Sequence, residues 1–389
     1  KDSYNKANVE SGNFAGGIAA ENYGAIENVY SVGLVSTTSS EGELKRVGSL
    51  VAVNANNGTL KNSYAQIPTQ LYVESLSNTN VDNVKAYTSN QLKNNSKFNN
   101  WDFTDVWTIY SGQYPTLKSQ SSDASISTLN IPDGSEERPY EITSAIGFKS
   151  IGNDAESLKA HYVLKNDISF ILDNGDQLVM DPIGSKTNDL FLGSLDGNGY
   201  SIKDIVMTSR TTALFRENAG TIKNLVIENA VMGNADTSDT AGLTFFNTGL
   251  ITNVAIIGGV FTGTNSVSGF AGTNKGNISQ SYIKDTVLTS DNESAGIVNL
   301  NTIDGSIRFV YSTADMRTSL NKKAMIAIYN VDEIKDVITN NKEKFIYNDS
   351  SDSVLNDPNN FNKSVPAIQM TDKSTFDIWD FTDTWGIDD

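Results

Sequence analysis

The sequence predicts an all-β chain folded as a parallel β-solenoid, and three observations support this. Short apolar runs alternate with turn residues, among them 30 Gly. No segment shows apolar spacing of three and four over ten or more residues, which disfavours helices. Asparagines also recur at steps of 29, 27, 27 and 29, namely Asn218, Asn247, Asn274, Asn301 and Asn330. In a parallel solenoid each coil lies about 4.8 Å above the last.

The residues around these asparagines repeat with the same period. Five positions before the first four asparagines stands a small residue: Ala213, Gly242, Gly269 and Gly296. An isoleucine follows each asparagine by four to six positions: Ile222, Ile251, Ile278, Ile307 and Ile334. Residues at equal phase stack into ladders, so we expect the apolar ladders to fill the interior of coils made of about three short strands.

The repeated asparagines are interpreted as structural. Asn tolerates left-handed backbone geometry at a turn, and its amide can bond to the copy above it. This explains the repeat without a ligand. The same phase recurs near the start of the chain at Asn22 and Asn54, with a slightly longer step. Residues 1–70 are therefore expected to form two further coils.

A larger duplication sets the predicted domains. WDFTDVW at Trp101 to Trp107 returns near the end of the chain as WDFTDTW at Trp379 to Trp385. We expect the C-terminal part of a first unit with its closing cap, a linker and a second unit, at 1–118, 119–130 and 131–389. Within the second unit we expect an entry cap, coils and a closing cap, at 131–205, 206–345 and 346–389. The entry cap contains a predicted helix from Ala145 to Leu158, capped by Ser144.

The repeated aromatic residues are predicted to close each unit. An open solenoid end exposes its interior, and large rings cover the most apolar area. The predicted closing caps are Trp101, Phe103 and Trp107 in the first unit, and Trp379, Phe381 and Trp385 in the second. A platform for stacking sugars is the alternative interpretation.

Four tyrosines share one phase of the repeat. Each follows the Val or Ser ladder by one residue, so its side chain is expected to face outward. They are candidates for a stacked binding ridge: Tyr30, Tyr64, Tyr282 and Tyr311.

Composition excludes several classes of function. The absence of cysteine removes disulfide scaffolds and thiolate chemistry, and the single histidine, His161, removes two-histidine zinc sites. A net charge of −17 disfavours nucleic acid as a partner. The apolar runs reach about half of the roughly 20 residues that a membrane helix needs, so no membrane span is expected.

Acidic residues offer the remaining chemistry. Those at Asp167, Asp173, Asp176, Asp181 and Asp196 do not repeat at the coil period, so a shared catalytic face is not expected. Asp196, in the LDGNG turn, is a candidate calcium ligand, although Asp-Gly is mainly turn chemistry. We therefore predict a non-enzymatic chain with no cofactor, calcium being the one candidate ion.

Three segments resemble a known family. GGIAAENYGAIENVYSVGLV (16–35) and AGLTFFNTGLITNVAIIGGV (241–260) are similar to GLUG repeats of bacterial surface proteins. SKFNNWDFTDVWTIYSGQYPTL (96–117) resembles the cap that follows such repeats in filamentous-haemagglutinin-like adhesins. The resemblance implies right-handed parallel β-helix units in tandem, in an extracellular protein of the bacterial cell surface.

This resemblance favours an adhesin or stalk segment, with a host or neighbouring-cell surface protein or glycan as partner. Self-association along a filament is a further expectation. Two alternatives stay open: the non-catalytic repeat region of a secreted protease or polysaccharide-degrading enzyme, and a structural filament or surface-layer component.

Overall fold

The computed structural model describes residues 1–37, 46–55, 57–66, 72–74, 80–109, 113–120, 132–172, 175–185, 190–320, 322–331, 334–339, 346, 362–365, 369–370, 372–376 and 379. Short parallel strands make up nearly all of its regular structure, and the two α-helices in these residues are α1 (Ser89–Leu92) and α2 (Ala145–Lys149). No helix among them is both long and apolar enough to cross a membrane. The predicted all-β solenoid is confirmed.

The chain forms two compact units. The first contains Lys1–Ile151 and Ala160–Val163, and the second contains Gly152–Lys159 and Leu164–Asp389. The division therefore falls inside the predicted entry cap rather than at the linker 119–130. Tyr140 of the predicted entry cap belongs to the first unit, where its Oη accepts a hydrogen bond from the Ser89 backbone at 2.8 Å.

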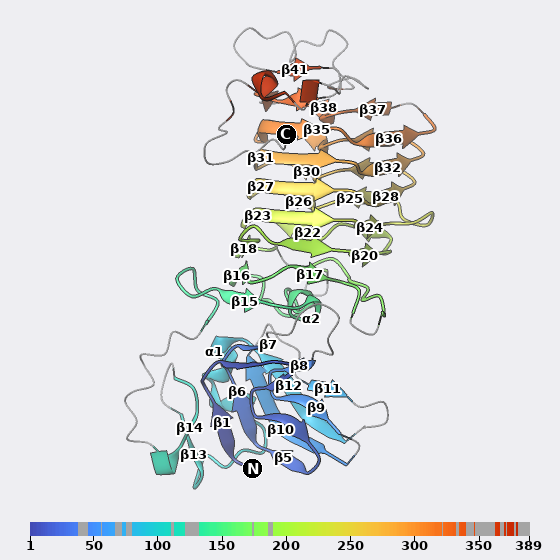
Figure 1. The fold of residues 1–389 in the computed structure, drawn as a ribbon. Helices are drawn as coiled ribbons and strands as arrows, with labels where there is room; N and C mark the ends of the chain where they lie inside the picture. The colour runs from blue at the N-terminus through green and yellow to red at the C-terminus, as the bar shows by residue number, and fades with distance from the viewer. Residues whose placement is uncertain are drawn as a thin grey trace. The chain divides into compact units, whose positions relative to one another are not determined.

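The second unit is a stack of coils, and each coil between residues 221 and 330 has four strands rather than the expected three (Figure 1). The long sheet contains β18 (Ser194–Asp196), β19 (Ser201–Lys203), β23 (Thr221–Glu228), β27 (Leu250–Ile257), β31 (Asn277–Lys284), β35 (Ser306–Ser312), β39 (Ile334–Lys335), β40 (Ile338–Thr339) and β41 (Lys363–Ser364). The next sheet contains β20 (Val206–Met207), β24 (Val231–Met232), β28 (Val260–Gly263), β32 (Val287–Ser290) and β36 (Asp315–Thr318).

Two further five-stranded sheets complete each coil. One contains β21 (Thr211–Thr212), β25 (Asp239–Ala241), β29 (Ser266–Ser268), β33 (Glu293–Ala295) and β37 (Lys322–Ala324). The other contains β22 (Phe215–Asn218), β26 (Thr244–Asn247), β30 (Ala271–Asn274), β34 (Val298–Asn301) and β38 (Ala327–Asn330). These two strands of a coil are separated only by a short bend, such as Gly242 and Leu243, which explains why the sequence suggested one strand.

The small-residue ladder lies at this bend. A Cβ added to Gly242 would stand 2.1 Å from the carbonyl oxygen of Gly269, and one added to Gly269 would stand 2.0 Å from that of Gly296. At these glycines, the backbone of the following coil fills the space that a side chain would occupy. The repeat of small residues follows from this close approach.

Apolar ladders fill the interior of the stack. Ile222, Ile251, Ile278 and Ile307 lie in register on successive coils and are at most 1% exposed. The residues after the small-residue ladder are equally buried: Leu214, Leu243, Phe270, Ile297 and Ile326. Apolar burial of this extent is the main stabilising contribution to the stack.

A left-handed residue interrupts the long sheet at the same position of each coil. Its φ is 53° at Asn224 and Asn253, 48° at Gln280, 52° at Phe309 and 56° at Asp336. Asparagine tolerates this conformation, and the side chains form a second ladder in which Asn253 Nδ2 donates to Asn224 Oδ1 at 2.9 Å. This ladder is not evident from the sequence because Gln280 and Phe309 interrupt the asparagine repeat.

The coil stack begins before the predicted boundary at residue 206. β18 and β19 already pair with β23, and Phe191 pairs with Asn218. β17 (Ile168–Ser169) pairs in turn with β19. The period is hidden here because Phe191 occupies the asparagine position of the repeat.

The first unit repeats the same plan over fewer coils. Its long sheet contains β1 (Ser3–Asn5), β5 (Ala25–Glu27), β6 (Val29–Ser31), β10 (Thr59–Gln66) and β12 (Val81–Tyr87). The other parallel strands are β2 (Val9–Ser11) with β7 (Val35–Thr37), β3 (Phe14–Gly16) with β8 (Arg46–Gly48), and β4 (Ala19–Asn22) with β9 (Val51–Asn54) and β11 (Tyr72–Glu74). Val29, Leu50 and Leu60 are among the buried residues of its interior.

The segments that follow the coils are less regular. The coils of the first unit are followed by α1, the 3-10 turn η1 (Asn95–Lys97), the antiparallel pair β13 (Trp107–Thr108) and β14 (Thr116–Leu117), and η2 (Lys118–Gln120). The entry segment contains β15 (Tyr140–Ile142), α2 and β16 (His161–Leu164). Ser144 Oγ caps α2 as predicted by accepting the Gly147 N–H at 3.1 Å. The helix is shorter than predicted because Gly152, at φ 82°, turns the chain.

Candidate binding surfaces

The predicted asparagine ladder is a continuous chain of hydrogen bonds between side-chain amides, buried except at its last link. Nδ2 of each asparagine donates to Oδ1 of the next, at 2.8 Å from Asn218 to Asn247, Asn247 to Asn274 and Asn274 to Asn301, and at 2.9 Å from Asn301 to Asn330. In the first unit Asn22 donates to Asn54 at 2.7 Å. The amides lie inside the coils and are occupied by one another, so the structure places them as fold determinants.

The ladder has a defined beginning in the second unit. Asn218 Oδ1 is buried and has no hydrogen-bond donor, because Phe191 takes the place of an asparagine in the preceding coil. Phe191 instead packs against Phe215, with ring centroids 4.9 Å apart. An unpaired buried acceptor costs about 1–3 kcal/mol, so the aromatic pair offsets a real penalty at this end.

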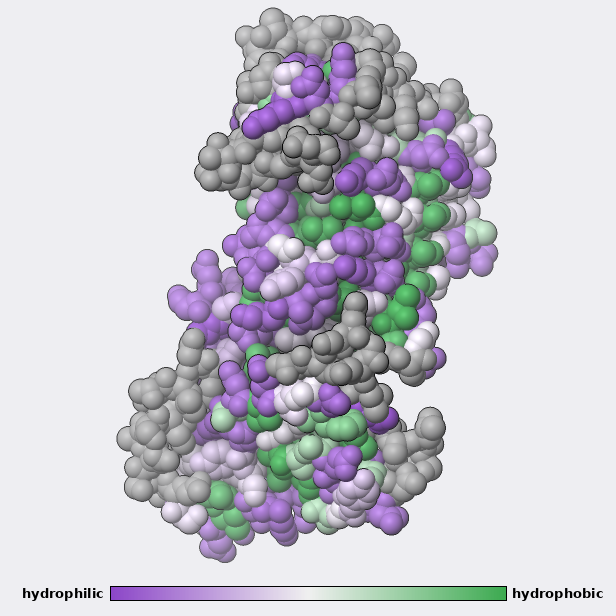
Figure 2. Space-filling model, viewed as in Figure 1, coloured by the Kyte–Doolittle hydropathy of each residue, from purple (hydrophilic) through white to green (hydrophobic). Residues whose placement is uncertain are grey.

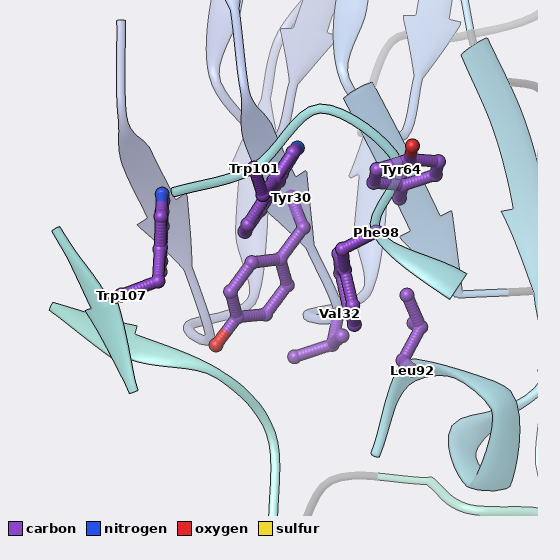
Figure 3. Packing of buried hydrophobic residues seen from close by; sticks show 7 residues of the cluster. All are labelled: Tyr30, Val32, Tyr64, Leu92, Phe98, Trp101 and Trp107. Carbon is purple, nitrogen blue, oxygen red and sulfur yellow. The ribbon is translucent and has the colours of Figure 1, made fainter. Parts of the chain in front are cut away.

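The tyrosines of the first unit do not form an exposed ridge, contrary to the prediction. Tyr30 and Tyr64 point away from the coil interior as expected, but both are 0% exposed. They pack beneath the segment after the coils, in a cluster with Val32, Leu92, Phe98, Trp101 and Trp107 (Figure 3). The rings of Tyr64 and Phe98 meet edge to face at 5.2 Å.

The closing cap therefore covers a different surface from the predicted one. Trp101 Nε1 donates to the backbone oxygen of Asn62 on β10 at 2.8 Å, and the Trp107 ring lies 6.2 Å from Tyr30 on β6. Phe103 packs at the margin of the same cluster. The cap lies across the outer face of the long sheet instead of plugging the last coil, because the tyrosine rings make that face apolar.

The second unit has the same arrangement in the part that the structure describes. The rings of Tyr282 and Tyr311 stack with centroids 4.6 Å apart and are half-buried. Trp379 and Phe376 each lie with their ring centroids 6.3 Å from that of Tyr311. Phe381 and Trp385 lie outside the described residues, so their part in the cap stays a prediction.

Burial of the tyrosines predicts loss of stability in alkali. Burial, with the neighbouring Tyr4 and Tyr114, raises the pKa of Tyr30 well above its usual value, and burial raises the pKa of Tyr114 to about 12. The unfolded chain releases these protons from about pH 10. Stability is therefore complete below about pH 10 and falls as the pH rises toward 12.

Urea unfolding of the first unit as a function of pH measures this effect. The double variant Tyr30→Phe and Tyr114→Phe should show a flatter decline above pH 10 than the wild type. An equal decline in both proteins would contradict the assignment of these phenols as the titrating groups.

Two acidic residues of the entry segment, Asp167 and Asp196, are bound to neighbouring side chains. Asp173 lies outside the described residues. Asp167 Oδ2 lies 2.9 Å from Lys203 Nζ, which holds the pKa of Asp167 below its usual range. Asp196 accepts bonds from the Asn198 N–H and the Asn224 amide and lies 3.3 Å from Lys223 Nζ. Asp196 thus serves to stabilise the turn at Asn198 and the side-chain ladder at Asn224. In the described residues no group of three or more His, Asp or Glu side chains could hold a metal ion.

A polar stripe runs along the outer face of β25, β29, β33 and β37. It consists of the in-register residues Asp239, Ser266, Glu293 and Lys322. Burial opposes the charge of Asp239, but hydrogen bonds from Ser238, Ser266 and Asn265 hold its pKa below the usual range. Glu293 lies 3.5 Å from Lys322 Nζ and accepts the Tyr329 hydroxyl at 3.0 Å. Its charged groups are thus largely compensated within the stripe.

An apolar stripe lies on the outer face of β20, β24, β28 and β32, where sequence analysis placed no site. The valine stripe consists of five in-register residues: Val179, Val206, Val231, Val260 and Val287. Val179, Val231 and Val260 are 42–47% exposed. Figure 2 shows the hydrophobic surface along β24, β28 and β32. At about 4.8 Å per coil the stripe is roughly 19 Å long.

The valine stripe ends where Asp315 takes the next position on β36. Arg317 Nη2 pairs with Asp315 at 2.7 Å, so the apolar surface is closed by an ion pair. The signal was available in the sequence, because Val206, Val231, Val260 and Val287 recur at nearly the same period as the asparagines. Aligned exposed valines of this kind are a candidate contact surface.

Comparisons with known proteins give one partial relative. No family model matches the chain. Halomucin of Haloquadratum walsbyi is 32% identical over 178 residues, which are 43% of this chain and 2% of halomucin. The chain thus spans a very small part of that relative. A solved chain assigned provisionally as an immunoglobulin A1 protease, from Bacteroides ovatus, aligns with a TM-score of 0.32 and 14% identity over 56% of this chain and 80% of that chain.

Proposed function

We propose that the chain is a non-enzymatic segment of an extracellular surface protein, serving as stalk and adhesive surface. The observation that carries this proposal is the in-register stack of coils, in which aligned outer positions form continuous stripes such as the valine stripe. Such a stack is extended along one axis and offers long, flat surfaces for binding. The partial match to halomucin supports it, since a segment that is 32% identical to part of this chain occurs there within a far longer protein.

The valine stripe is the surface through which we propose that contact is made. Five aligned β-branched side chains form a narrow apolar strip that loses water when it meets a complementary surface. The polar stripe on a neighbouring sheet adds carboxylate, hydroxyl and ammonium groups, which suit a hydroxyl-rich partner. The partner is a protein or glycan on the surface of a host or neighbouring cell.

The experiment compares binding of the wild type and the variant Val231→Ser and Val260→Ser to an array of glycans and matrix proteins. Both valines are exposed, so the fold should tolerate the change, and at least tenfold weaker binding is expected. The matched control is Ile303→Ser and Leu320→Ser, which removes two apolar side chains that are 70% and 64% exposed outside the stripe.

The outcomes separate the remaining functions. Weaker binding of the stripe variant alone supports the proposal. Equal loss in both variants would assign binding to general hydrophobicity and contradict the stripe. No binding by the wild type favours a structural filament component, and cleavage of an arrayed glycan favours a polysaccharide-degrading enzyme.

A further inference from the structure

The chain contains two copies of the same cap and two copies of the same surface beneath it. Phe98 and Trp101 of the first cap return as Phe376 and Trp379, and the tyrosines beneath them are Tyr30 and Tyr64 in one unit and Tyr282 and Tyr311 in the other. These tyrosine pairs are called the tyrosine ladders below. Each cap thus meets a tyrosine of the long sheet edge to face, Tyr64 in the first unit and Tyr311 in the second.

The separations between the cap rings are also similar. The ring centroids of Phe98 and Trp101 are 4.7 Å apart, and those of Phe376 and Trp379 are 5.0 Å apart. In both units the Phe ring meets a ladder tyrosine edge to face, and the Trp ring lies tilted to it at 5.7 and 6.3 Å. The aromatic contacts therefore provide little means for one ladder to distinguish the two caps.

The first cap also holds its own shape. Asp102 Oδ1 accepts the N–H groups of Thr104 and Asp105, both at 2.8 Å, and the Asp102 backbone oxygen accepts the Trp107 N–H at 2.8 Å. These bonds are made within the WDFTDVW motif rather than to the coils. The residues that make this turn recur as Asp380, Thr382 and Asp383. Because these hydrogen bonds lie within the motif, the turn does not need contacts with the coils to keep its conformation.

We propose that the caps are exchangeable between copies of this chain, so that the cap of one copy docks on the tyrosine ladder of another. Exchange of an identical element is a low-cost route to association, because the contacts are those already made within one chain. The tethered cap competes at an effective concentration in the millimolar range. Exchange between copies is therefore expected at high local concentration of the chain, or where a cap has been released from its own ladder. This inference rests on the packing of the caps and does not depend on the valine stripe.

Two complementary full-length variants test the proposal. Tyr30→Ser with Tyr64→Ser removes one ladder and frees its cap, whereas Phe98→Ala with Trp101→Ala disables the cap and leaves the ladder open. Mixed in equal amounts well below millimolar concentration, they are expected to form a one-to-one complex in analytical ultracentrifugation. Each variant alone, and the freed-cap variant mixed with the wild type, should remain predominantly monomeric.

Monomers in the mixture, with both variants retaining the circular dichroism spectrum of the wild type, would overturn the proposal. If either variant fails to fold, the wild type itself decides the question. Its sedimentation should show dimers as the concentration approaches about 1 mM, where copies compete with the tether. A wild type that remains monomeric there would overturn the proposal equally.

Discussion

Replacing Asn274 with alanine is expected to lower the free energy of unfolding of the coil stack by about 2–4 kcal/mol. Asn274 is 0% exposed, accepts from Asn247 Nδ2 and donates to Asn301 Oδ1, both at 2.8 Å. Alanine removes both hydrogen bonds from the middle of the ladder. Asn301 Oδ1 then loses its donor, and Asn247 Nδ2 loses its main acceptor. Urea denaturation followed by far-ultraviolet circular dichroism measures the change.

The control for this prediction is Asn277→Ala. Asn277 is an exposed residue of β31 close to Asn274, and exposed substitutions of this kind change stability by about 0.5 kcal/mol or less. Equal stability losses in the two variants would mean that the buried amide ladder has no special role in the stack.

Replacing Trp101 with alanine is expected to destabilise the first unit by about 3–5 kcal/mol, the range for truncating a buried aromatic residue. Its ring contacts Tyr64 at 5.7 Å, Phe98 at 4.7 Å and Trp107 at 4.2 Å between centroids, and its Nε1 bonds to the Asn62 oxygen. The second unit should be unaffected. Differential scanning calorimetry should therefore show one transition moved to lower temperature and one unchanged.

Two phenylalanine variants separate packing from hydrogen bonding in this cluster. Trp101→Phe loses the bond to Asn62, whereas Trp107→Phe loses none, because Trp107 Nε1 is buried without a hydrogen-bond partner. Trp101→Phe should be the more destabilising by about 1–3 kcal/mol. A reversed order would show that ring volume, rather than the indole N–H, determines the role of Trp101.

The sequence predicted the coil stack because its signals are periodic and local. The asparagine, small-residue and isoleucine ladders each need one residue type at one phase, and the structure stacks all three in register. The direction in which Tyr30 and Tyr64 point also followed from strand alternation. What covers them did not, because the position of the cap is determined by contacts between Trp101 or Trp107 and strands that lie much earlier in the chain.

Irregular coils were harder to predict. Phe191 breaks the asparagine repeat, and the coil that contains it was therefore assigned to the entry cap. The valine stripe was overlooked for a different reason. Val231 and Val260 are apolar residues like those of the core. Their exposed side chains show that they face outward, while the buried Met232 and Phe261 face inward.

The measurement that tests the central claim most directly is binding of the purified wild-type chain to glycans and matrix proteins, with cleaved glycan measured in the same wells. If the chain is a non-enzymatic adhesive segment, it should bind at least one partner saturably and release no cleaved glycan at any concentration of the chain. Release of cleaved glycan that rises with the concentration of the chain would contradict this claim.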